Sequence, residues 1–533
     1  MPIRITGLNS GLDTESIISA LVSSYNYKTQ KYEKAQTKLS WKQDAWKSLN
    51  TKIYSLYNSV GNLRFTSAYS TKKATVSNSS KVSVTAGGNA VNGLYNVQVE
   101  SLATSDYTTG AELSGKDGAK ITKSSTLKDL GYEGAESEWS LTVSGKEKKI
   151  NISGESTIQN VLDQLKKAGV NASFDEKNGR IFVNSKNAGE SNKIEFLTNG
   201  APTDSCSPSV TNEAPDDPSN PSTTNAADNA WDALGLIGEG AVQEHATDAK
   251  IWVNGAEYTG ESNVFTINGL TITATGVTGE YNQNNKDAVT VNVDVDAQSI
   301  YDKVKEFISQ YNAIMNEMST LYNAESSKGY EPLTDEEKDA MSDTEVEKWE
   351  EKIKSSILRR DDTIYNIMNS MANVMAKGID VDLDGDKKGD GKTYYLSDFG
   401  IKTLGYLYAP KNERYAYHID GDEDDTNTSG NDDKLMAAIT EDPEAVIGFM
   451  KQLSTELYNT IGSRMKSTSL SSSYTVYNDK EMASEYSDYT SLITKWKDRL
   501  EKQEEAYYKK FAAMESALAK INSQTSSLTG LLG

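Results

Sequence analysis

An apolar repeat that runs from Ile18 to Leu63 constrains this chain more than any other feature of its sequence. Stepping alternately by three and four residues from Ile18 gives fourteen positions, of which only Lys28 and Lys42 are charged. A 3.5-residue repeat of this length holds one stripe of a helix against a partner helix, so it predicts a long helix in a coiled coil or bundle. We call this row the N-terminal seam: Ile18, Leu21, Tyr25, Lys28, Tyr32, Ala35, Leu39, Lys42, Trp46, Leu49, Ile53, Leu56, Val60 and Leu63.

The other end of the chain carries a matching row, the C-terminal seam. Around Leu500 two consecutive steps of four residues form a stutter, which locally unwinds a left-handed supercoil. Two long amphipathic ends most simply pair as one antiparallel stalk, with everything between them looped out. Whether the aromatic residues of the seams fill the core of one chain or an interface between chains stays open. The C-terminal seam comprises Met482, Tyr486, Tyr489, Ile493, Trp496, Leu500, Glu504, Tyr507, Phe511, Met514, Leu518, Ile521, Thr525 and Leu528.

Strand patterns and helix patterns follow one another in blocks between the two ends. Residues 71–200 contain short β-rich runs, such as "KVSVTAGG" and "GLYNVQVESLA", and one helix pattern, "TIQNVLDQLKKAG", which places Val161, Leu162 and Leu165 on one face. Strand patterns continue to residue 297, and a long apolar stripe then predicts helix again. This order predicts a multidomain α+β protein with long terminal coiled-coil helices, a helical bundle layer, and nested, inserted β-rich domains.

These blocks give five expected segments. Five of the nine prolines lie between Ala201 and Trp231 among Ser, Thr, Asn and Asp, which is typical of an exposed loop or linker. We expect a terminal leg or coiled coil (1–40 with 491–533), a helical layer (41–70 with 298–490), an inner β domain (71–110 with 245–297), an outer α+β domain (111–200) and a Pro-rich loop or linker (201–230).

The charge of the chain excludes several classes of partner. The 533 residues carry a net charge of −22, and no cluster of Lys or Arg offers a local exception. Such a chain repels phosphates and anionic lipids, so we expect no nucleic-acid partner. No segment has the roughly eighteen consecutive apolar residues that span a bilayer, and the N-terminus lacks a basic-then-apolar secretory signal. We therefore expect neither membrane insertion nor export by the general secretory route.

The residues offer little catalytic chemistry. The single cysteine, Cys206, and the two histidines, His245 and His418, form no recognisable nucleophilic or metal-binding set. The opening "GLNSGLDTESII" matches neither a nucleophile elbow nor a phosphate loop, because it spells G-x-x-S-G without a following Lys. It predicts instead a flexible turn and a helix start, with Asp13 or Thr14 as the N-cap. We expect no enzymatic activity, no catalytic residue, no cofactor and no metal.

Two acidic stretches lie near residues 380 and 420. Residues 380–386 match the first positions of an EF-hand-type calcium loop, but position 12, where a bidentate acid is expected, is Gly391. The chelate is incomplete unless Asp390 or a distant carboxylate completes it, so a solvated hairpin turn is the competing interpretation. The later stretch "HIDGDEDDTNTSGNDD" predicts a mobile surface loop.

Several blocks of the chain carry a family resemblance. The opening "ITGLNSGLDTESIISALV" has a Ser-Gly-Leu-Asp turn before a terminal helix, and "STIQNVLDQLKKAGVNASFDEKNGRIFVNSKNAGE" looks like a flagellin-type insert. Later blocks are "WVNGAEYTGESNVFTINGLTITATG", "YYLSDFGIKTLGY" and "DDKLMAAITEDPEAVIGFM". In this order the blocks resemble the bacterial flagellar filament-capping proteins, also called the flagellar hook-associated protein 2 family. The resemblance departs from the family pattern in residues 201–230 and in the acidic stretches near 380 and 420.

The resemblance implies a structural protein at the distal tip of the flagellar filament. Such proteins form a ring, expected here to be a pentamer, that retains exported flagellin and promotes its folding and insertion during filament elongation. Export through the channel of the flagellum would place the protein outside the cell without a signal peptide. The implied partners are further copies of the chain, flagellin, the hook–filament junction proteins, the flagellar export apparatus and a chaperone. The implied role is in motility, and a role in cell adhesion stays open.

The resemblance also assigns residues to the legs of the ring. It places Gly7, Ser10, Gly11, Leu12 and Asp13 in a flexible leg tip. A segment that is ordered only by its partner binds weakly and reversibly, which suits a cap that must step as each subunit inserts. The expected partner-binding seam residues are Ile18, Leu21, Tyr25, Tyr32, Leu39, Met514, Leu518, Ile521 and Leu528.

Two rival functions remain. One is a secreted adhesin whose β domains bind host glycans or surface proteins. The other is a different axial flagellar protein, such as a junction protein, although the later blocks that match the capping family weigh against it.

Overall fold

The computed structural model describes residues 10–198, 201–203, 229–381 and 391–532. The chain divides into two compact units, a helical unit made from both ends (Met1–Tyr69 and Ala297–Gly533) and a β unit made from the middle (Ser70–Asp296). The predicted multidomain α+β class, with long terminal helices and inserted β-rich segments, is confirmed.

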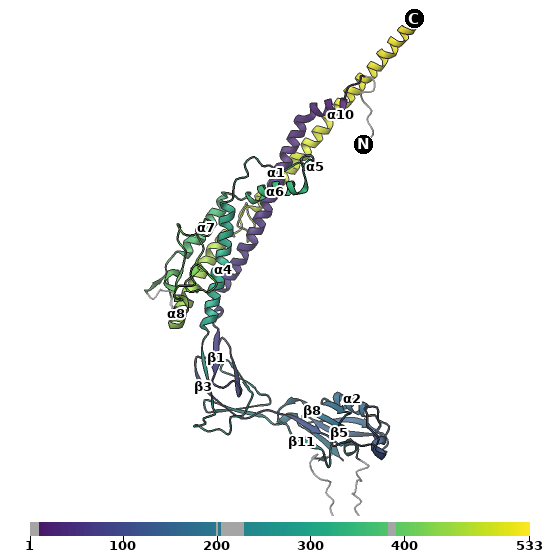
Figure 1. Cartoon of the computed structure of the whole chain (residues 1–533), viewed down its shortest axis with the longest axis vertical. Helices are drawn as coiled ribbons and strands as arrows, with labels where there is room; N and C mark the ends of the chain where they lie inside the picture. Colours follow the sequence, from purple (N-terminus) through teal and green to yellow (C-terminus); the bar gives the residue numbers. More distant parts are fainter. Residues whose placement is uncertain (1–9, 199–200, 204–228, 382–390, 533) are drawn as a thin grey trace, which may run out of the picture. The chain divides into compact units, whose positions relative to one another are not determined.

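The helical unit contains long helices at both ends of the chain and shorter ones between them (Figure 1). Two short strand pairings lie among the shorter helices: β17 (Ile379–Asp380) with β18 (Thr393–Tyr394), and β19 (Ile401–Lys402) with β20 (His418–Ile419). The helices are α1 (Thr14–Asn62), α4 (Ala297–Tyr322), α5 (Asp335–Asp339), α6 (Asp343–Ser355), α7 (Asp362–Met375), α8 (Lys434–Glu441), α9 (Pro443–Arg464) and α10 (Asp479–Leu532), with the 3₁₀ turns η1 (Thr66–Ala68) and η6 (Leu396–Phe399).

The core of the helical unit lies where the C-terminal half of α1 meets α4 and α9. Trp46 of α1 is 1% exposed and stacks on Tyr477 with ring centroids 5.3 Å apart. The apolar stripe predicted after Ser299 is the buried face of α4, so the sequence located this part of the core. Its buried members are Val304, Phe307, Ile308, Tyr311, Ile314, Met315 and Met318.

Glycine faces tyrosine on both sides of the contact between α1 and α9. A Cβ atom at Gly61 would lie 3.1 Å from Cε2 of Tyr458, and one at Gly462 would lie 3.2 Å from Cε2 of Tyr57. The two tyrosine rings stack with centroids 4.2 Å apart, and the hydrogen bond with Tyr458 raises the pKa of Tyr57 to about 12. The missing side chains of the two glycines therefore allow these helices to approach closely.

The inner part of the β unit consists of a five-stranded antiparallel sheet, in the order β1-β16-β3-β12-β13, and a three-stranded sheet, β14-β15-β2. Inward-facing side chains of both sheets form one core, because alternate residues of a strand point to the same face. Asn254–Gly255 and Asn268–Gly269, all at positive φ, close the hairpins β12–β13 and β14–β15, as Asn-Gly turns do. The strands are β1 (Lys72–Val76), β2 (Val82–Ala86), β3 (Gly93–Ser101), β12 (Ala249–Val253), β13 (Ala256–Gly260), β14 (Val264–Ile267), β15 (Leu270–Ala274) and β16 (Val289–Val295).

The outer part of the β unit has two four-stranded sheets, β10-β9-β5-β6 and β11-β4-β8-β7, around a second core. The predicted helix in this region is α2 (Ile158–Ala168), and its expected face of Val161, Leu162 and Leu165 is buried. The remaining elements are β4 (Ser105–Thr109), β5 (Ser137–Val143), β6 (Lys146–Ile152), β7 (Asn171–Asp175), β8 (Arg180–Ala188), β9 (Ile194–Thr198), β10 (Ala201–Thr203), α3 (Ala230–Ala233) and β11 (Val242–Glu244), with η2 (Lys116–Gly118), η3 (Leu127–Leu130) and η4 (Glu190–Asn192).

Two neighbouring chain segments connect the inner and outer parts of the β unit. The side-chain amide of Asn263 holds both backbone groups of Ala103, accepting from its N–H at 2.7 Å and donating to its carbonyl at 3.0 Å. Thr104 and Thr247 exchange backbone and side-chain hydrogen bonds beside it. The finer division into an inner domain, an outer domain and a Pro-rich loop stays a prediction, and residues 204–228 of that loop lie outside the described residues.

Candidate functional site

α1 and α10, the first and last helices of the chain, lie side by side and antiparallel, and we call this pair the α1–α10 hairpin (Figure 1). Tyr25 faces Trp496 with ring centroids 6.2 Å apart, and Tyr32 faces Tyr489 at 6.3 Å. Residue numbers rise along α1 as they fall along α10, so the predicted antiparallel stalk is confirmed. These aromatic residues thus make contacts within one chain, and a further role between chains stays open.

Polar contacts fix the register of the hairpin. The ammonium group of Lys497 on α10 lies 2.7 Å from the carboxylate of Glu33 on α1. One turn further along, the side-chain amide of Gln36 donates to Oγ1 of Thr490 at 2.7 Å. Neighbouring contacts at fixed positions on both helices hold them against sliding, although an exposed ion pair contributes at most about 1 kcal/mol.

Local sequence sets the start of α1. Of the two predicted candidates, Asp13 and not Thr14 is the N-cap, and its carboxylate accepts hydrogen bonds from the backbone N–H of Ser16 at 3.1 Å and from its hydroxyl at 2.6 Å. These hydrogen bonds lower the pKa of Asp13, because they stabilise the charged form at a helix N-terminus. Gly11 has φ +66°, a left-handed conformation that glycine adopts without strain.

The turn before α1 is tied to α10 through Glu515. Both the hydroxyl and the backbone N–H of Ser10 donate to the Glu515 carboxylate, which is only 9% exposed. A carboxylate that is shielded from water needs such donors. Leu12 is 47% exposed, and Gly7 lies outside the described residues. The flexible leg tip stays a prediction, and periodicity did not single out Glu515, because it lies beside the predicted seam and not in it.

Near its N-terminus the packed face of α1 follows a different phase from the predicted seam. Val22 and Thr29 are each 3% exposed, whereas Leu21, which we placed in the seam, is 45% exposed. Steps of four then three fit a 3.5-residue repeat as well as steps of three then four, so the pattern alone could not decide between them. From Leu39 onward the buried positions are the predicted ones: Leu39, Trp46, Leu49, Ile53, Leu56 and Val60.

α10 continues well past the point where α1 begins. After Glu515 it runs for residues 516–532, about 25 Å at the helical rise of 1.5 Å per residue (Figure 1). On this extension Ile521 is 55% exposed and Leu528 is 58% exposed, while Leu518 is half-buried. We call these three residues the distal α10 face. This apolar face continues the C-terminal seam beyond the hairpin, and it is the candidate binding site.

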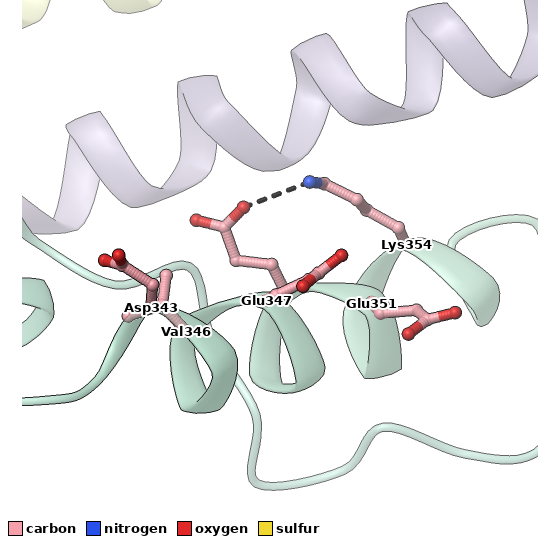
Figure 2. Close-up of a pocket in the computed structure, with 6 residues that line it drawn as sticks. Asp343, Val346, Glu347, Glu351 and Lys354 are labelled. Atoms are coloured by element: carbon pink, nitrogen blue, oxygen red, sulfur yellow. Dashed lines mark hydrogen bonds and ion pairs between the residues drawn. The ribbon is translucent and has the colours of Figure 1, made fainter.

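An acidic groove runs along α6 (Figure 2). Asp343, Glu347 and Glu351 follow one another at intervals of four residues along α6, and all three side chains are exposed. The one cation in the groove, Lys354, is already engaged by Glu350 at 3.0 Å and lies 4.6 Å from the ring centroid of Trp41. The groove therefore has the character of a solvated acidic surface, and we assign it no role.

The second acidic stretch makes contacts that its sequence did not predict. It lies at the surface, as predicted, but it is also tied to α4 by Lys305, whose ammonium group lies 2.6 Å from Oδ1 of Asp422 and 2.6 Å from Oδ2 of Asp424. The hydroxyl of buried Thr428 donates to the carbonyl of Ile419 at 2.7 Å. Charge density alone did not reveal this contact, in which one lysine on a neighbouring helix offsets part of the negative charge of the two carboxylates.

The histidines are each paired with one aspartate. Nδ1 of His245 lies 3.0 Å from Asp106, and Nδ1 of His418 lies 2.5 Å from Asp425. Within the described ranges, no group of three or more His, Cys, Asp or Glu could hold a metal ion. Residues 382–390 of the candidate calcium loop fall outside those ranges, so both interpretations of that loop stay open. None of the described helices has the length and apolar character needed to cross a membrane.

Comparison with known proteins places these features in one family. The model of the flagellar hook-associated protein 2 C-terminus matches residues 246–523, and that of the N-terminus matches residues 10–106. The flagellar hook-associated protein 2 of Halalkalibacterium halodurans is 23% identical over an alignment of 572 residues that covers 99% of each chain. The Thermotoga maritima relative is 24% identical over 405 residues, 72% of this chain and 54% of its own.

Among solved structures, the D1-D2-D3 domains of the flagellar cap protein FliD from Escherichia coli align with a TM-score of 0.46 at 17% identity, covering 78% of this chain and 95% of that one. The assignment does not depend on this structural similarity. It rests on the family models, of which the C-terminal one alone matches more than half of the sequence. The chain belongs to the flagellar hook-associated protein 2 family.

Proposed function

We propose that this protein caps the distal tip of the bacterial flagellar filament. There it assembles into a ring, retains exported flagellin and promotes its folding and insertion. Membership of the family supports the flagellar role, and solved relatives from Escherichia coli and Pseudomonas aeruginosa are named flagellar cap protein FliD and FliD (HAP2). The observation that carries the proposal is the distal α10 face, an exposed apolar stripe at the free end of a long helix.

An exposed apolar stripe on a helix fits a groove between partner helices. In this mode of recognition, apolar side chains spaced by three or four residues enter the groove while the polar face stays in water. The open end of a helical flagellin lattice would offer such grooves. Burying the exposed half of Ile521 and of Leu528 contributes roughly 1–1.5 kcal/mol each, and ordering costs offset part of it. The contact is thus weak enough to be released and remade as each subunit inserts.

The predicted leg tip would act at the same end of the hairpin. Of its residues, Ser10, Gly11, Leu12 and Asp13 directly precede α1, and the Ser10–Glu515 contact brings this turn to the base of the α10 extension. A binding function of this kind needs no catalytic residue and no cofactor. Export through the flagellar channel, with the export apparatus and a chaperone as partners, would bring the protein to the tip, where it meets flagellin and the junction proteins.

Charge placed on the distal α10 face tests this proposal. We would replace Leu518, Ile521 and Leu528 together by Asp and express the variant in a flagellated strain that lacks its own cap protein. The matched control replaces Ser516, Ser523 and Ser527 by Asp, which adds three charges on the opposite side of the same helix. Filament length is measured by electron microscopy, and flagellin lost to the medium is measured by immunoblotting.

The proposal predicts short or missing filaments and abundant free flagellin for the first variant, and normal filaments for the control. Circular dichroism of both purified proteins and immunoblots of the exported protein would show that each folds and leaves the cell. Normal filaments with the Leu518, Ile521 and Leu528 variant would contradict the proposal. Adhesion is not needed by this function and stays a separate prediction.

A further inference from the structure

The turn at residues 406–408 presents an exposed apolar surface on the helical unit. Tyr406, Leu407 and Tyr408 are 69%, 87% and 85% exposed, and the last two are the most exposed large apolar side chains in the described residues. The turn begins at Gly405, which has φ +84° and accepts a hydrogen bond from the backbone N–H of Tyr408 at 3.2 Å. Consecutive large apolar residues that point into water mark a contact surface. We call these three residues the aromatic knob.

Two cations accompany the aromatic knob. The guanidinium carbon of Arg414 lies 3.7 Å from the ring centroid of Tyr406, and Lys411 is exposed nearby in the sequence. In the part of the chain that the structure describes, neither side chain forms an ion pair, and Nε of Arg414 is buried without a hydrogen-bond partner. Glu413 lies between them, so the knob keeps a net positive charge on a chain with a net charge of −22. Tyrosine and arginine side by side are typical of interface centres.

The outer part of the β unit has a groove of complementary character. It has a volume of about 420 Å³ and lies beside η3 and α3. Half-buried apolar side chains line its floor, and two acids lie among them. The floor is formed by Ala111, Leu113, Leu130 and Ala233, and the two acids are Glu112 and Asp232.

Asp232 is the unusual member of this groove. Its carboxylate is half-buried, burial raises its pKa, and among the described residues it has no hydrogen-bond or ion-pair partner. A partly desolvated carboxylate without a partner is costly, and a cation from outside would relieve that cost. The sequence of residues 204–228, which precedes α3, contains no Lys or Arg that could supply it. The groove therefore combines an apolar floor with a carboxylate that a cation from a partner would stabilise.

We propose that the aromatic knob of one copy of the chain docks into this groove on a second copy. Leu407 would then rest on the apolar floor, and the two cations beside the knob would face Glu112 and Asp232. A second copy is the favoured occupant because one sequence supplies both surfaces, matched in apolar character and opposite in charge. Knob and groove are different surfaces, so the contact is head-to-tail and repeats into a closed ring or an open chain. The inference rests on the proposed function, which requires copies of this chain to assemble.

A cysteine pair tests the contact without altering any charge. Two full-length variants, both carrying Cys206→Ser, receive Tyr408→Cys in the knob and Ser114→Cys at the groove. When the two are mixed under mild oxidation, we expect a disulfide-linked dimer that contains one of each, identified by mass spectrometry. The control mixture pairs Tyr408→Cys with Leu94→Cys, a position on the β unit that is 69% exposed. We expect at least tenfold less linked product from the control.

Charge reversal tests the electrostatic part. Lys411→Glu with Arg414→Glu should weaken association at least tenfold, and so should Glu112→Lys with Asp232→Lys. All four substitutions in one chain should restore association to within about threefold of the original, because opposite charges again face each other. Failure of the combined variant to recover, with each protein folded by circular dichroism, would overturn the pairing. The cysteine pair decides the question if a charge variant fails to fold.

Light scattering on the same full-length protein separates this inference from the proposed function. If the chain oligomerises but the knob and groove cysteines do not link above the control, the inference is wrong and the cap function stands. If the chain stays monomeric at every concentration and no link forms, the inference is overturned together with the ring that the proposed function includes. If the knob and groove cysteines link specifically but the variant with Asp at Leu518, Ile521 and Leu528 builds normal filaments, the inference is supported and the proposed cap function is contradicted.

Discussion

The hydroxyl and the backbone N–H of Ser10 both donate hydrogen bonds to the carboxylate of Glu515, 505 residues further along the chain. This contact closes the α1–α10 hairpin at its open end. It also places the turn that precedes α1 beside the start of the α10 extension, where the distal α10 face begins. The order of the first described residues therefore depends on a side chain from the other end of the sequence.

Removing Glu515 should loosen the N-terminal end of α1. In Glu515→Ala the Ser10 donors lose their charged acceptor, a contact worth about 1.5–3 kcal/mol when one partner is ionised. Amide hydrogen exchange in residues 14–18 should therefore become roughly tenfold faster or more, while exchange in the C-terminal half of α1 should not change. Glu501→Ala, at an exposed position of the same helix, is the matched control. Equal protection in both variants would show that this contact does not order the turn.

Trp496 should contribute strongly to the pairing of α1 with α10. Its ring faces Tyr25, and the ammonium group of Lys28 lies 4.3 Å from its centroid, so Trp496→Ala removes an aromatic and a cation–π contact together. We expect the free energy for opening the hairpin to fall by about 2 kcal/mol, as measured by hydrogen exchange along α10. Tyr27→Ala is the control, because Tyr27 is 69% exposed on α1. If Tyr27→Ala lowers the free energy for opening the hairpin as much as Trp496→Ala does, the contacts of the Trp496 ring do not stabilise the pairing specifically.

Alanine substitutions at two hairpin-turn glycines distinguish the cost of backbone strain from the cost of a steric clash. Gly269 and Gly145 have φ of +78° and +69°, so alanine is strained at either position by about 1–2 kcal/mol. A Cβ at Gly269 would also lie 2.8 Å from the backbone N of Ala90, whereas nothing lies within 4 Å of one at Gly145. Gly269→Ala should therefore destabilise the protein by about 1–3 kcal/mol more than Gly145→Ala in denaturant unfolding. Equal losses would show that the chain around Ala90 moves away freely.

The sequence predicted those features that depend on local periodicity. The 3.5-residue repeats located α1 and α10, the Ser-Gly-Leu-Asp turn narrowed the N-cap to Asp13 or Thr14, and the apolar face of α2 was correct residue by residue. It could not choose between Leu21 and Val22, because two phases of the same repeat leave comparable apolar rows. Contacts between distant residues, such as Lys305 with Asp422, carry no periodic signal at all. The contact of Glu515 with Ser10 carries no periodic signal either, because it depends on the axial positions of α1 and α10 relative to each other.

The ion pair between Lys34 and Glu337 predicts a pH dependence for the docking of α5 on α1. The Lys34 ammonium group lies 2.7 Å from Glu337, and this contact, together with the backbone N–H of Thr334, holds the pKa of the Glu337 carboxyl below its usual value. A carboxyl whose pKa is lower in the folded state stabilises that state above its unfolded pKa of about 4.3. The stabilisation is lost as the pH falls below that value and through the folded pKa.

Glu337→Gln should therefore weaken this docking near pH 7, by at most about 1 kcal/mol because the pair is partly exposed, and should have little effect near pH 2. Glutamine keeps an acceptor for the N–H of Thr334 in the capping box, so the substitution isolates the charge. Glu336→Gln removes the same charge from an exposed neighbour and should have little effect at either pH. Hydrogen exchange in residues 335–339, compared between variants at each pH, measures the difference. A gap between Glu337→Gln and the original protein that stays constant down to pH 2 would mean that the charge of Glu337 is not what stabilises the contact.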